Sequence, residues 1–142
     1  MNTFRVLVVD DEVDFLETII NRLQKRKVDA TGVPNGEAAL ELIKEKPFDV
    51  ILLDIKMPGG MDGIEVLREI KKVKPLIEVI LLTGHASVET SIEGLRMGAF
   101  DYLIKPVKFD EVLEKLAAAF QKKNIQEQKI HNAKIKELVH SE

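Results

Sequence analysis

The sequence contains no cysteine, which excludes disulfides, thiol chemistry and a zinc site with cysteine ligands. No apolar run is long enough to cross a membrane, and the N-terminus lacks the basic and then apolar segments of a secretory signal. A formal net charge of -3 gives no basic surface for nucleic acid or for an anionic membrane. These absences favour a cytoplasmic protein with no direct contact to nucleic acid or membrane.

The chain is 142 residues long, with 45% apolar and 32% charged residues, as expected for one globular domain with a short appendage. The apolar pattern degrades after Phe120, where the sequence becomes rich in lysine, glutamine and glutamate. We therefore predict a domain over residues 1–120 and a helical extension or linker remnant over residues 121–142. No apolar heptad holds across the second segment, so a dimerising helix is the less favoured alternative.

Short apolar runs typical of buried strands alternate with stretches of helical spacing. The expected strands cover residues 4–9, 28–33, 48–53, 79–82 and 101–104, and the expected helices cover residues 13–25, 36–46, 64–73, 88–97 and 109–120. Because a helix follows each strand, right-handed crossovers give a parallel sheet with helices on both faces. The predicted fold class is α/β, with five strands in the flavodoxin-like order 2-1-3-4-5.

The expected helix at residues 88–97 has an unusual composition. It contains Thr90, Ser91 and Gly94, which are poor helix formers, and Ser87 is its expected N-cap. Its apolar residues are Val88, Ile92 and Leu95. Two interpretations stay open: a weakly held helix that moves, and a short helix that packing of its apolar residues stabilises.

Polar side chains follow four of the expected strands at the point where each strand ends. They are Asp10 and Asp11 after the first strand, Asp54 after the third, Thr83 after the fourth and Lys105 after the fifth. Any one of them alone is best explained as a solvated residue or a helix cap. The carboxyl ends of parallel strands, however, lie along one edge, where α/β proteins place their sites. We therefore expect these side chains to meet in one cleft.

Three carboxylates in one place repel each other, so such a cluster requires shared protons or a bound cation. An all-oxygen site suits Mg²⁺, with Mn²⁺ as the alternative. Lys105 adds a positive charge, and Thr83 adds a hydroxyl that can donate a hydrogen bond. A cation, an ammonium and a hydroxyl around one carboxylate can stabilise a transferring phosphoryl group, for which Asp54 can be the nucleophile.

Four motifs resemble those of the receiver domain of two-component response regulators. They are Val9-Asp10-Asp11-Glu12, Leu53-Asp54-Ile55-Lys56-Met57-Pro58, Leu82-Thr83-Gly84-His85 and Ala99-Phe100-Asp101-Tyr102-Leu103-Ile104-Lys105-Pro106. The resemblance runs from Phe4 to Phe120 and implies a regulatory phosphoacceptor, not an enzyme that acts on a separate substrate. Asp54 would accept the phosphoryl group from a sensor histidine kinase or a phosphotransfer protein. The output would pass to an effector domain or protein, or to a second copy through dimerisation on phosphorylation.

The resemblance also implies roles for the other polar residues. Mg²⁺ would be held by Asp10, Asp11, Asp54 and the backbone carbonyl of Lys56. Thr83 and Lys105 would contact the phosphoryl group, and Lys105-Pro106 would be a cis peptide bond. On phosphorylation Thr83 would move toward the phosphoryl group and Tyr102 would turn inward. The surface formed by the fourth helix, the fifth strand and the fifth helix would then change.

One loop departs from the family pattern. The segment Pro58-Gly59-Gly60-Met61-Asp62-Gly63 has one residue more than the usual Pro-Gly-Met-Asp-Gly. The additional glycine is expected to loosen the loop beside Asp54 and to change access to the phosphoryl group, so deleting Gly60 should alter the phosphoryl lifetime. His85 is expected to be a surface loop residue, with a role in hydrolysis of the acyl phosphate as the alternative.

Two other classes of function compete with a receiver. A phosphatase or phosphotransferase with an aspartate nucleophile, of the haloacid dehalogenase type, needs a second aspartate two residues after the nucleophile, where this chain has Lys56. Such an enzyme would also need a cap domain to enclose its substrate. An interaction module that is never phosphorylated is disfavoured by the complete set of site residues.

Overall fold

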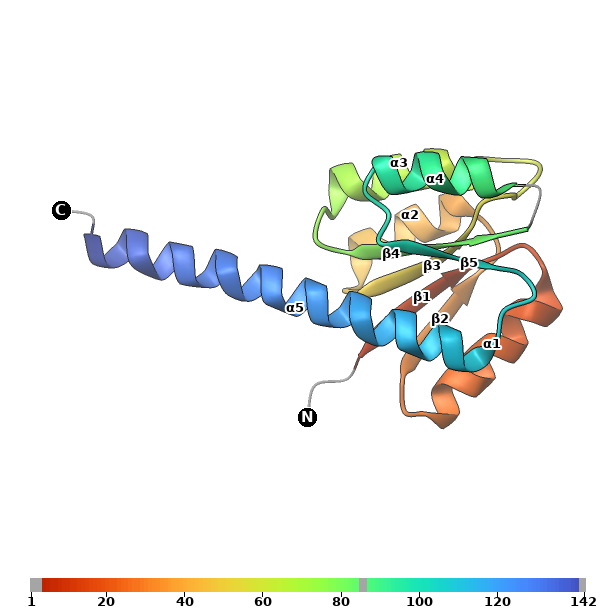
Figure 1. The fold of residues 1–142 in the computed structure, drawn as a ribbon, viewed down its shortest axis with the longest axis horizontal. Coiled ribbons are helices and arrows are strands. Elements are labelled where there is room, and N and C mark those ends of the chain that lie inside the picture. Colours follow the sequence, from red (N-terminus) through yellow and green to blue (C-terminus); the bar gives the residue numbers. More distant parts are fainter. Residues whose placement is uncertain (1–3, 85–86, 141–142) are drawn as a thin grey trace.

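Five parallel strands form the centre of the molecule in the computed structural model, which describes residues 4–84 and 87–140 (Figure 1). The strands are β1 Arg5–Val9, β2 Asp29–Val33, β3 Val50–Asp54, β4 Glu78–Thr83 and β5 Asp101–Ile104. They lie in the order β2-β1-β3-β4-β5, which makes β2 and β5 the edges of the sheet. The predicted α/β fold class and strand order are confirmed.

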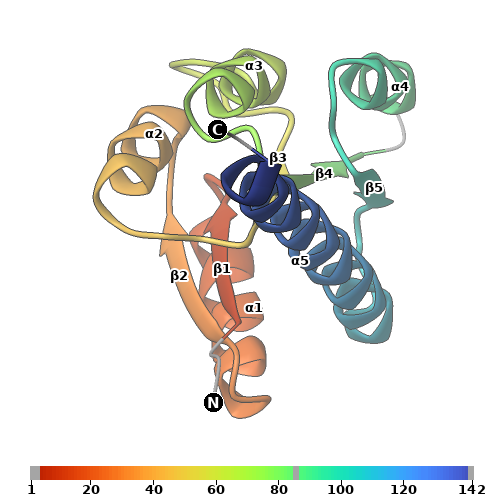
Figure 2. The same ribbon diagram turned by 90° about the vertical axis from the view of Figure 1, so that its left-hand side faces the viewer.

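Helices cover both faces of the sheet. They are α1 Val13–Lys25, α2 Gly36–Glu45, α3 Gly63–Val73, α4 Val88–Arg96 and α5 Phe109–His140. Figure 2 shows α2, α3 and α4 on one face and α1 and α5 on the other. Alternate residues of the central strand β3 enter the two cores, with Leu53 on the side of α2 and α3 and Leu52 on the side of α1 and α5. A strand buried on both faces explains the continuous apolar run in its sequence.

The starts of α2 and α4 differ in their caps. Asn35 caps α2, because its side-chain oxygen accepts a hydrogen bond from the backbone N–H of Ala38 at 2.8 Å. Ser87 stands at the N-cap position of α4, but its side chain makes no cap hydrogen bond. Its backbone carbonyl instead accepts a bond from the hydroxyl of Ser91 at 3.2 Å. The prediction of Ser87 as a capping side chain is therefore wrong.

Small residues hold α4 against the sheet. Ser91 and Gly94 are the buried residues of this helix, whereas Ile92 is 43% exposed. A Cβ atom at Gly94 would lie 2.4 Å from the Cδ1 of Leu81, so the close approach of α4 to β4 requires glycine there. Of the apolar residues expected to pack, Ile92 is therefore wrong, whereas Leu95 is partly buried and packs against the core. Two of the poor helix formers, Ser91 and Gly94, are the buried residues of the helix.

The helix α5 continues as one helix to His140 and projects away from the rest of the molecule (Figure 1). Its first turns after Phe120 remain attached to the sheet by two ion pairs. The Nζ of Lys122 lies 3.3 Å from a carboxylate oxygen of Glu78, and the Nζ of Lys123 lies 3.1 Å from one of Asp49. The direction of α5 is thus fixed by contacts beyond the predicted end of the domain. Over the two described ranges, no helix is long and apolar enough to span a membrane.

Removing the carboxylate of Glu78 is expected to destabilise the fold. Its side chain is only 3% exposed and lies between the ammonium groups of Lys122 and Lys71, 3.8 Å away on α3. Glu78→Ala leaves both ammonium groups without their shared partner, at a cost of about 2 kcal/mol in the free energy of unfolding. Urea unfolding measures this cost. Glu41→Ala, which removes an exposed carboxylate paired with Lys44, is the control and should change the free energy of unfolding far less.

Candidate functional site

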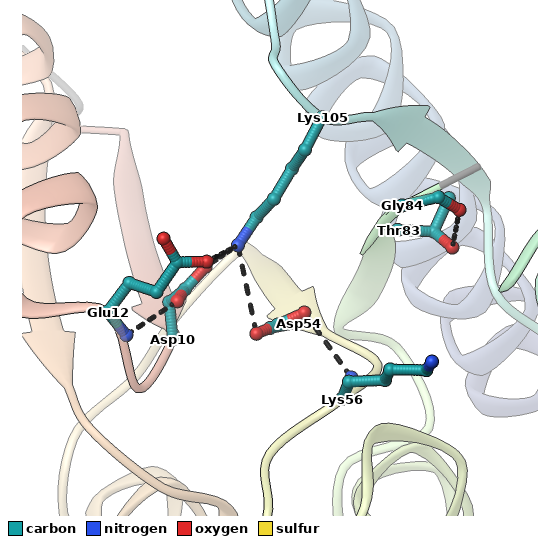
Figure 3. Close-up of polar contacts among 7 residues, drawn as sticks. All are labelled: Asp10, Glu12, Asp54, Lys56, Thr83, Gly84 and Lys105. Carbon is teal, nitrogen blue, oxygen red and sulfur yellow. Dashed lines mark hydrogen bonds and ion pairs between the residues drawn. The ribbon is translucent and has the colours of Figure 1, made fainter. Parts of the chain in front are cut away.

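The carboxyl ends of β1, β3 and β5 bring two carboxylates and one ammonium together (Figure 3). Val9 pairs with Leu53 in the sheet, so Asp10 and Asp54 follow side by side. Asp10 is fully buried and Asp54 is 6% exposed. Lys105 follows β5 and reaches back across the sheet edge to both of them. The parallel register therefore brings together Asp10, Asp54 and Lys105, three of the residues that the strand ends predicted to meet.

Lys105 is the centre of this cluster. Its Nζ lies 2.6 Å from the Oδ2 of Asp10 and 3.7 Å from the Oδ2 of Asp54 (Figure 3). It also donates a hydrogen bond to the Oε1 of Glu12 at 3.1 Å. The sequence reasoning gave no role to Glu12. The sequence pointed to Glu12 only through its place next to Asp10 and Asp11. Its contact with Lys105 could not be predicted, because the two residues are 93 positions apart.

Burial is the largest cause that raises the pKa values of the two buried carboxyl groups. The pKa of Asp54 is raised to about 7, mainly by burial and next by the neighbouring carboxylate of Asp10, while Lys105 and the N–H of Lys56 oppose the change. Burial likewise raises the pKa of Asp10. Burial is the largest single influence on Lys105 and lowers its pKa, but the hydrogen bonds to Asp10 and Glu12 and the charges of Asp10 and Asp54 together outweigh it, so the net pKa is raised. The site therefore favours a cation near Asp54.

Three carboxylates are close enough to share a metal ion. One carboxylate oxygen from each of Asp10, Asp11 and Asp54 lies within 4.8 Å of the others. The donors are all oxygens, and Asp11 is exposed to solvent, which fits a hard cation that keeps some of its water. This donor set is chemically suited to Mg²⁺ or Mn²⁺.

The loop after β3 is bonded back to the end of that strand, through the side chain of Asp54 and the backbone carbonyl of Ile55. The N–H of Lys56 donates to the Oδ1 of Asp54 at 3.3 Å, and the N–H of Gly63 donates to the carbonyl of Ile55 at 2.8 Å. A Cβ atom at Gly63 would lie 2.5 Å from the carbonyl oxygen of Asp54. Glycine at this position thus allows the start of α3 to pack directly on the end of β3, which holds Asp54 in place.

Thr83 lies at the same edge, but its hydroxyl makes no hydrogen bond with Asp54. Its hydroxyl is buried and donates to the carbonyl of Gly84 at 3.0 Å (Figure 3). Tyr102 on β5 is partly buried and packs against the core on the side of α2 and α3. The Lys105-Pro106 peptide bond is cis, as the resemblance implied. His85 lies outside the described residues.

Known proteins with related sequences are regulators. The family model of the response regulator receiver domain matches residues 6–117. The transcriptional regulatory protein ZraR of Klebsiella oxytoca is 43% identical over 114 residues, which cover 80% of this chain and 26% of that protein. The chain thus spans about a quarter of the length of this relative.

Solved receiver domains have the same fold. The receiver domain of NtrX from Brucella abortus is 32% identical, with a TM-score of 0.79 over 82% of this chain and 98% of that one. A receiver domain protein from Clostridium thermocellum is 33% identical, with a TM-score of 0.82 over 87% of this chain and 98% of that one. The family match includes the strands that carry Asp10, Asp54 and Lys105. The chain therefore belongs to the receiver domain family of two-component response regulators.

Proposed function

We propose that Asp54 accepts a phosphoryl group from a sensor histidine kinase or a phosphotransfer protein. The observation that carries this proposal is the position of Lys105, whose ammonium lies beside both Asp10 and Asp54. Asp10 is fully buried in a short ion pair, whereas the nearest ammonium to Asp54 lies 3.7 Å away. Of the two buried carboxylates, Asp54 is thus the one less committed to an existing ion pair.

In the reaction, a carboxylate oxygen of Asp54 attacks the phosphorus of a phosphohistidine. The P–O bond of an acyl phosphate forms, the P–N bond breaks, and the leaving imidazole nitrogen takes up a proton. Lys105 balances negative charge on the phosphoryl oxygens during transfer. Asp10, Asp11 and the backbone carbonyl of Lys56 would hold Mg²⁺, which supplies further positive charge when bound.

Phosphorylation would then change the surface formed by α4, β5 and α5. A phosphoryl oxygen on Asp54 offers the hydroxyl of Thr83 a charged acceptor in place of the carbonyl of Gly84. Movement of Thr83 would leave space that Tyr102 fills from β5. Support comes from α4, whose only buried residues are the small Ser91 and Gly94, so that movement of this helix would expose no large, fully buried side chain of its own.

The proposed role is regulatory, with phosphoryl transfer and hydrolysis as self-catalysed steps. The receiver domain would comprise residues 1–120, and residues 121–142 would form a helical extension of α5. The recipient of the signal would be an effector domain or protein, or a second copy of the chain. The ion pairs of Lys122 with Glu78 at the start of β4 and of Lys123 with Asp49 just before β3 support this view, because they hold the first turns of the extension against the receiver domain.

Phosphoryl uptake from a small donor tests the proposal directly. The chain is incubated with phosphoramidate and Mg²⁺, and its intact mass is measured. We expect the mass of one phosphoryl group, lost on treatment with hydroxylamine, which cleaves acyl phosphates. EDTA should prevent uptake. No added mass, or an added mass that hydroxylamine leaves unchanged, would contradict phosphorylation of a carboxylate.

Substitution of Asp11 tests the proposed magnesium site separately from phosphorylation. This residue is exposed, so Asp11→Asn should leave the fold intact while removing one charged ligand. We expect Mg²⁺ affinity, measured by isothermal titration calorimetry, to fall about tenfold or more. Asp14→Asn, an exposed carboxylate in the first turn of α1, is the control. Equal Mg²⁺ affinity in the wild type and Asp11→Asn would show that Asp11 is not a ligand.

A further inference from the structure

A single side chain of α2 reaches the loop that follows the proposed phosphoacceptor. Glu37 lies in the first turn of α2, and its Oε1 accepts a hydrogen bond from the backbone N–H of Met61 at 3.0 Å. The two residues are 24 positions apart in the sequence. Met61 belongs to the loop between β3 and α3, which begins next to Asp54. This contact therefore ties α2 to the loop at the site.

Gly60 provides the space for this contact. A Cβ atom at Gly60 would lie 2.8 Å from the Oε2 of Glu37 and 3.0 Å from its Oε1. The φ angle of Gly60 is not in the left-handed region, so the lack of a side chain matters here for space and not for backbone conformation. Gly59 differs, since its φ is 89° and a Cβ atom there would meet nothing within 4 Å. The carboxylate of Glu37 therefore occupies the space that a side chain at position 60 would need.

This hydrogen bond between Glu37 and Met61, called the tether below, acts on a loop that is fixed at both ends. At its start, the N–H of Lys56 binds the carboxylate of Asp54, and at its end Asp62 caps α3. The bond to Glu37 holds the middle of the loop, where the chain has its additional glycine. The sequence indicated that this glycine would loosen the loop. In the structure, the missing side chain leaves room for a carboxylate that binds the backbone beside it, a contact that the sequence did not predict.

We propose that Glu37 is a positioning residue for the chemistry at Asp54, which it controls through the segment Gly59–Met61. The inference rests on the proposed function. With the tether in place, the loop keeps a fixed position beside the acyl phosphate and limits the access of water. Without it, the loop moves, water reaches the acyl phosphate more often, and hydrolysis becomes faster.

Three single substitutions test the tether. Glu37→Ala removes the acceptor, Gly60→Ala displaces the carboxylate by its added methyl group, and Glu37→Gln keeps an oxygen that can accept the bond. The chains are loaded with phosphoramidate, the donor is removed, and loss of the phosphoryl group is followed by intact mass. Glu37→Ala and Gly60→Ala should shorten the phosphoryl lifetime about fivefold, the factor that corresponds to about 1 kcal/mol for one hydrogen bond. Glu37→Gln should stay close to the wild type.

A double-substitution cycle separates the tether from general damage to the fold. In the Glu37→Ala background, Gly60→Ala should have no further effect, because the atoms it displaces are already gone. Glu41→Ala, which removes an exposed carboxylate of the same helix, should leave the lifetime unchanged. Amide hydrogen exchange gives a second readout: the N–H of Met61 should exchange faster in Glu37→Ala and in Gly60→Ala than in the wild type.

The results have distinct meanings. An unchanged lifetime in Glu37→Ala overturns the inference and leaves the proposed function intact. Equal lifetimes in Glu37→Gln and Glu37→Ala overturn it too, because they would show an effect of charge and not of the hydrogen bond. A wild-type chain that takes up no phosphoryl group overturns the proposed function and this inference with it.

Discussion

Asp54→Asn is expected to abolish phosphoryl uptake. The carboxamide lacks the anionic oxygen that attacks phosphorus, and no other carboxylate of the cluster is placed to replace it. Asp10 is fully buried and held 2.6 Å from Lys105, and Asp11 is exposed at the rim. Intact mass after incubation with phosphoramidate and Mg²⁺ should show no added phosphoryl group in this variant, while the wild type is modified.

The matched control is Asp29→Asn. Asp29 is 54% exposed at the start of β2, the opposite end of the sheet from the site, so its loss should leave uptake unchanged. Asp54→Asn preserves shape and removes only charge and nucleophile. Phosphorylation of Asp54→Asn at the wild-type rate would therefore place the acceptor elsewhere in the chain.

The second large effect concerns stability without metal. The pKa of Asp54 is about 7 in the folded chain, compared with 3.8 for an unperturbed aspartate, because burial and Asp10 disfavour its charge. Between these two pH values the folded state binds more protons than the unfolded state. The protonated carboxyl group of Asp54 therefore makes its full contribution to the stability of the folded chain below pH 3.8. This contribution is lost as the pH rises through about 7. The free energy of unfolding should fall by up to about 1.4 kcal/mol per pH unit in this window.

Urea unfolding in EDTA, repeated across the window, measures this loss. The raised pKa of Asp10 adds to it in the same direction. Asp54→Asn cannot ionise at this position, so its stability should depend less on pH and should exceed that of the wild type near neutral pH. Addition of Mg²⁺ should restore the stability of the wild type at neutral pH, because it binds the ionised carboxylates. A wild type that becomes more stable from acidic to neutral pH without metal would contradict this account.

The sequence was sufficient for the fold and for most of the site because both follow from local patterns. The continuous apolar runs identify strands buried on both faces, and in a parallel sheet their ends must share one edge. Asp10, Asp54 and Lys105 each come directly after such a run. To predict that these three residues meet, only the strand order was needed in addition, and the alternation of strands and helices predicted that order.

The contacts that the sequence did not predict depend on packing between distant segments. Glu12 reaches Lys105 and Glu37 reaches Met61 only once the folded chain brings them together. In α4 the hydrophobic pattern pointed to Ile92, but the buried residues are Ser91 and Gly94, and the space between Gly94 and Leu81 leaves no room for a side chain. The continuation of α5 to His140 has no apolar periodicity in the sequence, because its later turns are exposed to solvent.

Chemical trapping of the acyl phosphate is the most direct test of the central claim. Borohydride reduces an aspartyl phosphate to homoserine, and sequencing of the peptides by mass spectrometry then identifies the modified residue. After treatment with phosphoramidate and Mg²⁺, we expect homoserine at position 54 and unmodified aspartate at positions 10 and 11. Homoserine at Asp10 or Asp11, or none in a chain that has gained phosphate, would contradict the assignment of Asp54 as the phosphoacceptor.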